Sequence, residues 1–317
     1  MRLVSLVFLI GSIAVAGVVL MRVAVRGESS VDEVSSARAE LLVGSDASGR
    51  RVEMGGVAER VVVLDASGLE ILLALGVEPM LRPPFMGETP EHWKGIEELS
   101  YSHAAGPDVE QLILASPDLV VLSPTFARFA GVIEGVVDAE MLTIEVRSVE
   151  DAARWARELG RLTGAAERGE EVAAEMLAAA PEQGLDEGTG GPRVMALLGA
   201  PNAYFEVTEG SYIGDLVRRA GGELVTSGAP EHGVYQGLAP LSLEGLIAAD
   251  PEVILLMGHG AASSLPDDAA WRSLRAVRDG RVVELPERLF VLAPGAEVGR
   301  AYALMRDALF GEVAAGG

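Results

Sequence analysis

VEQLILASPDLVVLSP, from Val109 to Pro124, is the stretch that decides the fold. It begins with apolar residues at helical spacing, reaches Pro117, and continues into the aliphatic run LVVL. Proline disfavours the helical conformation of the residue before it, so the helix should end there. A continuous aliphatic run is typical of a strand buried on both faces of a parallel sheet. The stretch therefore predicts a short helix that leads into a central strand.

The chain repeats this pattern at Leu243 to Met257, where it reads LEGLIAADPEVILLM. In both copies a glutamate, Glu110 or Glu244, stands near the start, and a proline and an acidic residue precede the strand. Each helix is expected to bury one apolar face, formed by Val109, Leu112 and Ile113 in the first copy and by Leu243, Leu246 and Ile247 in the second. Two such units in register predict two similar α/β lobes.

Composition excludes several classes of protein. The 317 residues are enough for two domains of ordinary size, and 49% of them are hydrophobic while 23% are charged, which is typical of a globular chain. The net charge of −22 argues against a nucleic-acid partner, because phosphates require basic surfaces. The absence of cysteine excludes disulfides, thiolate metal sites and a cysteine nucleophile.

The amino terminus carries an export signal. Leu3 to Met21 is an uninterrupted stretch of apolar or small residues that follows Arg2, so residues 1–26 are predicted to be a signal peptide or an N-terminal membrane anchor. Ala14-Val15-Ala16 fits a cleavage site, but the stretch is also long enough to span a bilayer, and both fates remain open. We expect an exported protein on the periplasmic or extracytoplasmic face, followed by a polar tether over residues 27–48.

The rest of the chain is predicted to form two lobes and a connector. Residues 49–147 form the N-terminal α/β lobe, which starts with the strand VVVLD at Val61 to Asp65. Residues 148–182 are rich in Ala, Glu, Arg and Leu at helical spacing and predict a long connecting helix, with a break or kink at Thr163-Gly164. Residues 183–317 form the C-terminal α/β lobe.

The order of these segments resembles the periplasmic binding proteins that deliver iron-siderophores, haem or vitamin B12 to ABC importers. The resemblance runs from about Arg51 to Gly311 and includes, besides the two repeat units, the segments ERVVVLDASGLEILLALGVEPML, GSYIGDLVRRAGG, AVRDGRVVELP and PGAEVGRAYALM. It implies an α/β fold of two lobes with central, mainly parallel sheets, joined by one long helix, with a ligand cleft between the lobes. It also implies capture and delivery of a ligand without any enzymatic step or intrinsic cofactor.

The resemblance further implies that one glutamate on each lobe docks onto arginines of an ABC permease in the cytoplasmic membrane. These glutamates map to Glu110 and Glu244. A carboxylate near a helix start is favoured by the helix dipole, and two separated charges would steer and align a partner. The expected partners are this permease and a small-molecule ligand, with no nucleic acid, and the protein is expected to be a monomer.

In haem-delivering members of the family, the iron-binding side chain lies a few residues before the docking glutamate. His103 stands seven residues before Glu110 and Tyr235 nine before Glu244, so we expect them to be the axial ligands of haem iron, with Tyr101 as a substitute. The segment Ser100 to His103 departs from the Gly-Tyr pair typical of haem-binding members. Further expected ligand contacts are Tyr101, Trp93, Tyr204 and His259.

The ligand is left open among an iron complex and a corrinoid. A ferric siderophore would require arginines in the cleft, for which Arg82 and Arg128 are candidates. Cobalamin would use stacking aromatics such as Trp93 and Phe85. A bare zinc or manganese ion is less favoured, because none of the four histidines pair at HxH or HxxxH spacing.

Two other classes of function remain. A membrane-anchored α/β hydrolase would need a nucleophile, and Ser67 is its best candidate, although the context DASGLE lacks the GxSxG elbow. A ligand-sensing binding module that works without a transporter would share every residue with the transport protein, and only permease docking separates the two.

Overall fold

The structure is a computed structural model that describes residues 42–85, 89–102, 106–182, 190–200, 203–231, 237–258, 269–295 and 297–311. The described residues all belong to one unit, Leu42–Gly317. The predicted signal or anchor, residues 1–26, lies outside them. Within the described ranges, no helix has both the length and the apolar character needed to cross a membrane.

The first sheet has five parallel strands in the order β5-β4-β3-β8-β9. The strands are β3 (Val61–Leu64), β4 (Leu81–Arg82), β5 (Glu97–Glu98), β8 (Leu119–Leu122) and β9 (Glu140–Thr143). Alternate residues of β3 enter two different cores: Val61 and Val63 lie with residues of α3 (Ala66–Ala74), and Val62 and Leu64 lie with residues of α4 (Val109–Ala115) and α6 (Ala130–Glu134). Because helices cover both faces, the aliphatic runs VVVL and LVVL are buried throughout, as predicted.

The second sheet has six strands, with β13-β11-β10-β14-β15 in order and β12 paired to β10. They are β10 (Arg193–Ala200), β11 (Ala203–Val207), β12 (Glu223–Leu224), β13 (Leu238–Pro240), β14 (Val253–Met257) and β15 (Val282–Glu284). The strands β10, β12, β14 and β15 run parallel, while β11 and β13 are antiparallel additions. Residues of α9 (Tyr212–Ala220) and α13 (Val298–Phe310) pack on one face, and those of α10 (Leu243–Ala249), α11 (Ala269–Ser273) and α12 (Arg275–Arg278) pack on the other.

The sequence repeat is also a structural repeat. Helix α4 leads into β8 and helix α10 leads into β14, and each helix ends in a residue with positive φ, Ser116 at 42° and Asp250 at 39°. The acidic residue after each proline then binds the start of the neighbouring strand. Asp118 accepts the backbone N–H of Glu59 at 2.8 Å, and Glu252 accepts that of Arg193 at 2.9 Å. The Pro-acid pair therefore ends a helix and fixes the register of two adjacent strands.

The predicted buried face of these helices is partly wrong: Leu243 is 39% exposed, and one isoleucine of each helix is exposed as well. Leu112 and Leu246 are fully buried, but Ile113 is 49% exposed and Ile247 is 44% exposed. Both helices are only two turns long, and each buries a second, smaller residue at its end, Ala115 or Ala249, in place of the isoleucine. The helical spacing located the face to within one residue, and the isoleucine lies just outside it.

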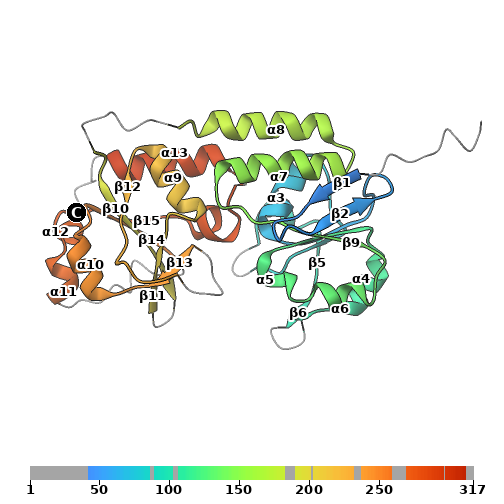
Figure 1. The fold of residues 1–317 in the computed structure, drawn as a ribbon, viewed down its shortest axis with the longest axis horizontal. Helices are drawn as coiled ribbons and strands as arrows, with labels where there is room; N and C mark the ends of the chain where they lie inside the picture. The colour runs from blue at the N-terminus through green and yellow to red at the C-terminus, as the bar shows by residue number, and fades with distance from the viewer. Residues whose placement is uncertain are drawn as a thin grey trace, which may run out of the picture. The chain divides into compact units, whose positions relative to one another are not determined.

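The connector is a pair of helices. The break predicted at Thr163-Gly164 is present, and it divides residues 148–182 into α7 (Val149–Leu162) and α8 (Ala166–Ala179). The single long connecting helix is therefore corrected to two helices, which lie side by side along their length (Figure 1). Gly164 adopts a φ of 78°, which only glycine tolerates readily, and this conformation reverses the chain.

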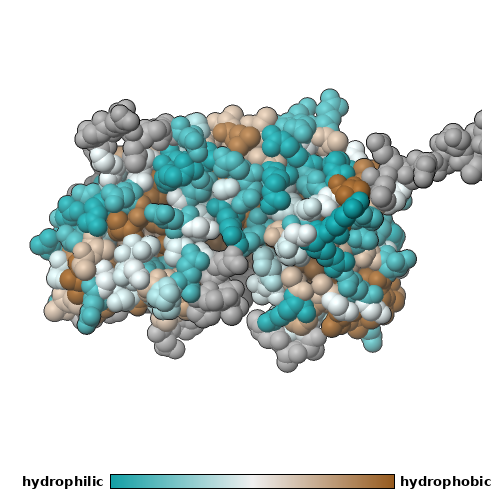
Figure 2. Space-filling view, viewed as in Figure 1, coloured by the Kyte–Doolittle hydropathy of each residue, from teal (hydrophilic) through white to brown (hydrophobic). Residues whose placement is uncertain are grey.

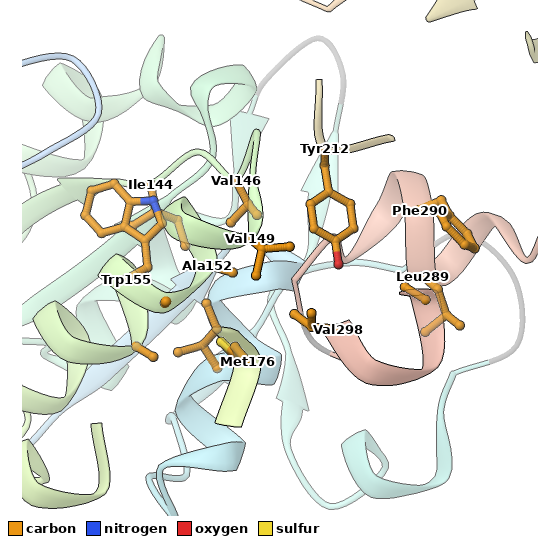
Figure 3. Close-up of a cluster of buried hydrophobic side chains, with 14 of the residues drawn as sticks. Ile144, Val146, Val149, Ala152, Trp155, Met176, Tyr212, Leu289, Phe290 and Val298 are labelled. Carbon is orange, nitrogen blue, oxygen red and sulfur yellow. The ribbon is translucent and has the colours of Figure 1, made fainter. Parts of the chain in front are cut away.

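One hydrophobic core runs through both lobes. It includes Ile144 and Val149 from the end of the first sheet and the start of α7, and Tyr212 and Val298 from α9 and α13 (Figure 3). The strands of the first sheet lie within residues 49–147 and those of the second within residues 183–317, the ranges predicted for the lobes.

The predicted tether, residues 27–48, is too long by several residues. Leu42–Ser45 form strand β1, which pairs antiparallel with β2 (Arg51–Met54) and places residues 42–48 in the folded unit. Asp46 closes the hairpin by accepting the backbone N–H groups of Ser48 and Arg50 at 2.9 and 2.8 Å. A short Ser-rich turn between two strands has the same composition as a flexible linker, which is why the sequence did not separate them.

Candidate functional site

The carboxyl ends of parallel strands place polar residues along one edge of the first sheet. Asp65 follows β3, Ser123 follows β8, and Glu145 lies two residues after β9. In open α/β sheets, ligands bind beyond this edge because the connecting loops there are free to carry functional side chains. The candidate site therefore comprises this edge and the matching edge of the second sheet.

An aromatic cluster with one arginine lies at this edge. The rings of Tyr101 and Phe126 are 4.9 Å apart, and Phe129 lies 6.2 Å from Tyr101. Arg128 donates a hydrogen bond to the Tyr101 hydroxyl at 3.1 Å, and its guanidinium carbon lies 4.7 Å from the centre of the Phe129 ring. These four residues, the Tyr101 cluster, combine three aromatic rings packed at steep angles to one another with one exposed positive charge.

Local sequence builds this cluster. Ser123 caps α5 (Pro124–Ala127) by accepting the Phe126 backbone N–H at 3.3 Å, and Pro124 occupies the first helical turn, where a proline is well tolerated. Phe126 lies in this helix and Phe129 shortly after it, and the rings of both pack against Tyr101 of β6 (Tyr101–Ser102). Gly106 makes room for them, because a Cβ atom there would lie 2.7 Å from the Phe129 ring.

The second sheet contributes a smaller aromatic pair at its own carboxyl edge. Tyr204 on β11 lies opposite Gly199 of β10, and its ring is 5.6 Å from that of Trp271 on α11. Gly258, directly after β14, has a φ of 112°, and a Cβ atom there would lie 2.7 Å from the Gly199 carbonyl oxygen. A glycine is thus required at this edge, where two neighbouring backbones approach each other closely.

A pocket of about 170 Å³ joins residues of the two lobes. Glu145 and Arg147 line it from the first lobe, Ser211 and Tyr212 from the start of α9, and Phe290 from the π-helical turn η3 (Arg288–Leu292). Pockets for small molecules usually measure 300–1,000 Å³. A ligand of that size would have to contact residues beyond those that line this pocket.

Burial changes the acid–base properties of two groups near these edges. Burial raises the pKa of Asp65 to about 6, against the opposing effect of hydrogen bonds from the Gly68 and Ser67 backbone amides. Burial likewise raises the pKa of the Tyr212 phenol, which therefore stays protonated in the physiological range. The hydrogen bond that Arg147 donates to the Glu145 carboxylate raises the pKa of the arginine, so this pair remains ionised beside the pocket.

The predicted ligand contacts divide into three groups. Tyr101 and Tyr204 are half-buried at the two sheet edges. Trp93, by contrast, is fully buried on η1 (Glu91–Trp93), with its ring 4.9 Å from Phe85, so it supports the loop and cannot stack on a ligand in this conformation. His103, Tyr235 and His259 lie outside the described residues, and their assignment as iron ligands or ligand contacts stays a prediction.

Of the two arginine candidates, Arg128 is exposed and Arg82 is not. Arg82 is buried and donates to Glu98 at 2.5 Å and to the carbonyl oxygens of Ile96 and Pro83. Its guanidinium fixes the loop after β4, and the prediction of a cleft arginine there is corrected. Arg128 could have been singled out from PTFARF, in which two aromatic residues flank an arginine directly after a buried strand.

The docking candidates Glu110 and Glu244 are both exposed, on α4 and α10. Neither carboxylate forms an ion pair with another described residue. In the same described ranges, no three His, Asp or Glu side chains lie close enough to hold a metal ion. Ser67, the candidate nucleophile, is buried in the first turn of α3, which argues against a hydrolytic role.

A further ionic group was not anticipated from the sequence. Glu70 of α3 is buried and accepts hydrogen bonds from Arg288 at 2.9 Å and from His92 at 3.0 Å. Arg288 also pairs with Glu297 before α13. Residues 70 and 288 are so far apart along the chain that no local pattern relates them.

Comparison with known proteins agrees with this architecture. The haem-uptake protein IsdE of Staphylococcus aureus is 28% identical over 127 residues, a match that covers 38% of this chain and 42% of IsdE. The crystal structure of S. aureus IsdE complexed with heme has a TM-score of 0.65 at 21% identity, covering 79% of this chain and 98% of that one. The catecholate-siderophore binding protein VctP of Vibrio cholerae has a TM-score of 0.68 at 16% identity, covering 84% of this chain and 99% of that one.

These structural similarities concern the fold, and the family follows from the sequence itself. A family model described as "Periplasmic binding protein" matches residues 61–289, which run from the first residue of β3 to the π-helical turn before α13. The matched range contains both repeat units, both sheets and the helix pair α7–α8. The chain therefore belongs to the periplasmic binding protein family.

Proposed function

We propose that this protein is the solute-binding component of an ABC importer that captures an iron complex, either haem or a ferric siderophore, and delivers it to a membrane permease. The observation that carries the proposal is the Tyr101 cluster at the carboxyl edge of the first sheet, in a chain of this family. An aromatic surface suits a flat or catecholate ligand, and Arg128 suits the negative charge that haem propionates and ferric catecholates carry. The IsdE and VctP similarities support these two ligand classes.

In this proposal the protein performs no bond chemistry. The ligand is held between the two lobes, with the Tyr101 cluster on one side and the Tyr204–Trp271 pair on the other. For haem, His103 and Tyr235 are the proposed axial ligands and Tyr101 is the substitute, because histidine and tyrosine are established protein ligands of haem iron. His259 is proposed as a further ligand contact. Residues 1–26 would export the protein and either be removed or anchor it.

The test is an absorption titration of residues 27–317 with haemin, with a ferric catecholate siderophore and cobalamin titrated in parallel. A saturable shift of the haem Soret band would identify haem, and loss of that shift in His103→Ala or Tyr235→Ala would identify the axial ligands. Saturable binding of the siderophore alone would assign the protein to the second class. Binding of cobalamin alone, or of none of the three, would refute the proposal of an iron complex.

Arg128→Gln tests the role of the cluster. Removing the guanidinium is expected to raise Kd about tenfold or more for an anionic iron complex, because a charge-assisted contact contributes about 1.5–3 kcal/mol. Arg278→Gln is the matched control, since Arg278 is also an exposed arginine but lies on α12, away from both carboxyl edges. Equal effects of the two substitutions would show that only net charge matters.

A further inference from the structure

The two repeat helices depart from ordinary amphipathic packing in the same way. Ile113 lies three residues after Glu110, and Ile247 lies three residues after Glu244. Each isoleucine is about half exposed, although a leucine one position earlier is fully buried. Residues three apart share one face of a helix, so each glutamate has an exposed isoleucine beside it.

Single exposed aliphatic side chains are common and need no explanation. Here, however, two separate helices each carry an exposed isoleucine at the same position relative to an unpaired glutamate. This recurrence needs an explanation. Glu110, Ile113 and Leu114 form what we name the first docking patch, and Glu244, Leu243 and Ile247 form the second. Leu114 is 81% exposed and Leu243 is 39% exposed, so each patch has two exposed aliphatic side chains next to its carboxylate.

The first patch continues onto a neighbouring helix. Val132 and Val136, at α6 and directly after it, are also exposed. Leu112 of α4 and Ile133 of α6 belong to one buried core, so these helices cover the same face of the first sheet. Figure 2 shows hydrophobic side chains gathered on the surface over α4 and α6.

Both patches stand on helices that are fixed in place. Asp108 accepts the Glu110 backbone N–H at 2.9 Å, and Arg60 donates to the Ala115 and Ser116 carbonyl oxygens at the other end of α4. A partner would therefore meet a preorganised surface and lose little conformational entropy on binding it.

Helix α10 is fixed by comparable contacts. The Ser242 hydroxyl accepts the Gly245 backbone N–H at 3.2 Å, and a Cβ atom on Gly245 would lie 2.6 Å from the Ser227 carbonyl oxygen, which shows how closely the helix approaches that backbone. Both patches are thus held with similar rigidity on separate lobes.

We propose that each docking patch binds one subunit of the permease through an apolar contact as well as a charge, so that Ile113 and Ile247 insert beside a cationic group of the partner. The proposal rests on the proposed function and specifies the chemistry of the partner surface: a basic residue next to an apolar recess, present twice. The charge of −22 and the unpaired glutamates disfavour a second copy of this chain and an anionic lipid surface, because like charges would face each other.

The two docking patches differ in apolar area, and this difference sets the direction in which the protein docks on the permease. The position of Leu114 in the first repeat is occupied by Ala248 in the second. The first patch, extended by Leu114 and the exposed valines of α6, therefore offers the larger apolar contact. On charge alone, a permease with two similar subunits could bind the protein in either of two opposite orientations. The larger first patch favours one of these orientations.

Site-specific photocrosslinking in cells of the source organism tests this surface. The full chain carries Leu114→benzoylphenylalanine or Ala248→benzoylphenylalanine, and Val57→benzoylphenylalanine is the control because Val57 is also 49% exposed but belongs to neither patch. Light-dependent adducts with an ABC permease, identified by mass spectrometry, are expected from positions 114 and 248 and not from position 57. Adducts with a second copy of the chain or with lipid, or no adducts at all, would overturn the proposal.

A second set of variants separates apolar contact from charge. Ile113→Gln or Ile247→Gln is expected to lower the adduct yield at the crosslinker on the same helix about tenfold, as the loss of a buried aliphatic contact predicts. Unchanged yields in these variants, with yields lost in Glu110→Gln and Glu244→Gln, would show that charge alone directs docking and would refute the apolar contact. Haemin and siderophore titration of the same variants tests the proposed function separately, because both patches lie outside the candidate site.

Discussion

Asp65 is an acidic residue whose pKa the fold raises, through burial of its carboxyl group. Its carboxyl stays protonated in the folded protein up to a pH of about 6, whereas in the unfolded chain it ionises near 3.8. Between these values the folded state holds a proton that the unfolded state has released, so the contribution of this group to stability is lost as pH rises from about 4 to about 6. At neutral pH the ionised carboxylate therefore lowers the free energy of unfolding.

Asp65→Asn is expected to remove this penalty. Asparagine caps a helix as well as aspartate does, so the acceptor for the Gly68 backbone N–H is retained while the charge is lost. We expect the variant to be more stable than the natural protein by roughly 1–3 kcal/mol at pH 8 and of similar stability near pH 4. Urea unfolding of both proteins across this range measures the difference, and a constant difference at all pH values would contradict it.

Residue identity in the candidate site was only partly predictable. Tyr101 and Arg128 could be named because aromatic and cationic residues after strand ends are candidates in any α/β lobe. Their hydrogen bond, and the packing of Phe126 and Phe129 around them, join segments more than twenty residues apart. Arg82 is the opposite case. Its guanidinium donates hydrogen bonds to buried carbonyl oxygens, and the sequence does not distinguish such an arginine from one that contacts a ligand.

At the scale of the elements, the helix pair α7–α8 depends on two glycines. A Cβ atom on Gly160 would lie 2.9 Å from the Ala165 carbonyl oxygen and from the Gly169 Cα atom, and one on Gly169 would lie 2.8 Å from the Ala156 carbonyl oxygen. All of these neighbours are backbone atoms, which cannot rotate away. The two helices therefore approach each other more closely than alanine would allow.

Gly160→Ala is expected to destabilise the protein by roughly 1–3 kcal/mol, because overpacking outweighs the gain in helix propensity of about 1 kcal/mol. Gly131→Ala is the matched control, since Gly131 lies in α6 and has open space around its Cβ position, so that propensity alone should act and stability should rise slightly. The midpoints of thermal unfolding of the two variants should move in opposite directions. A rise in both midpoints would show that the helices can separate at little cost.

The elements themselves were largely predictable because local sequence specifies them. The aliphatic runs became buried strands, and the helices ended where Pro117 and Gly164 required. Local sequence could not specify whether residues 148–182 form one continuous helix or two helices packed against each other, because both arrangements have the same helical period. The outcome depends on the contact of Gly160 with Gly169, which is a tertiary property.

At the scale of the whole molecule, a buried ionic network joins the connector to the second lobe. Asp215 of α9 accepts the backbone N–H of Val149, the first residue of α7, at 2.9 Å and the Arg219 Nε–H at 2.8 Å. Arg219 also donates to the Ala180 carbonyl oxygen at 2.7 Å and pairs with Glu150. The sequence indicated only a helix in SYIGDLVRRAGG, since the partners come from α7 and the end of α8.

Two adjacent arginines allow the importance of this network to be measured, because both bind Asp215 but only one is buried. Arg219 is 2% exposed and Arg218 is 55% exposed. Arg219→Gln leaves a buried carboxylate with one partner fewer and should cost about 3–5 kcal/mol, whereas Arg218→Gln should cost less than about 1 kcal/mol. If the network couples the two lobes, Arg219→Gln should also separate the urea transitions seen by tryptophan fluorescence and by circular dichroism, because the lobes would no longer unfold together. Coincident transitions with equal losses of stability would instead show that the hydrophobic core alone joins the lobes, and that the ionic network adds no coupling of its own.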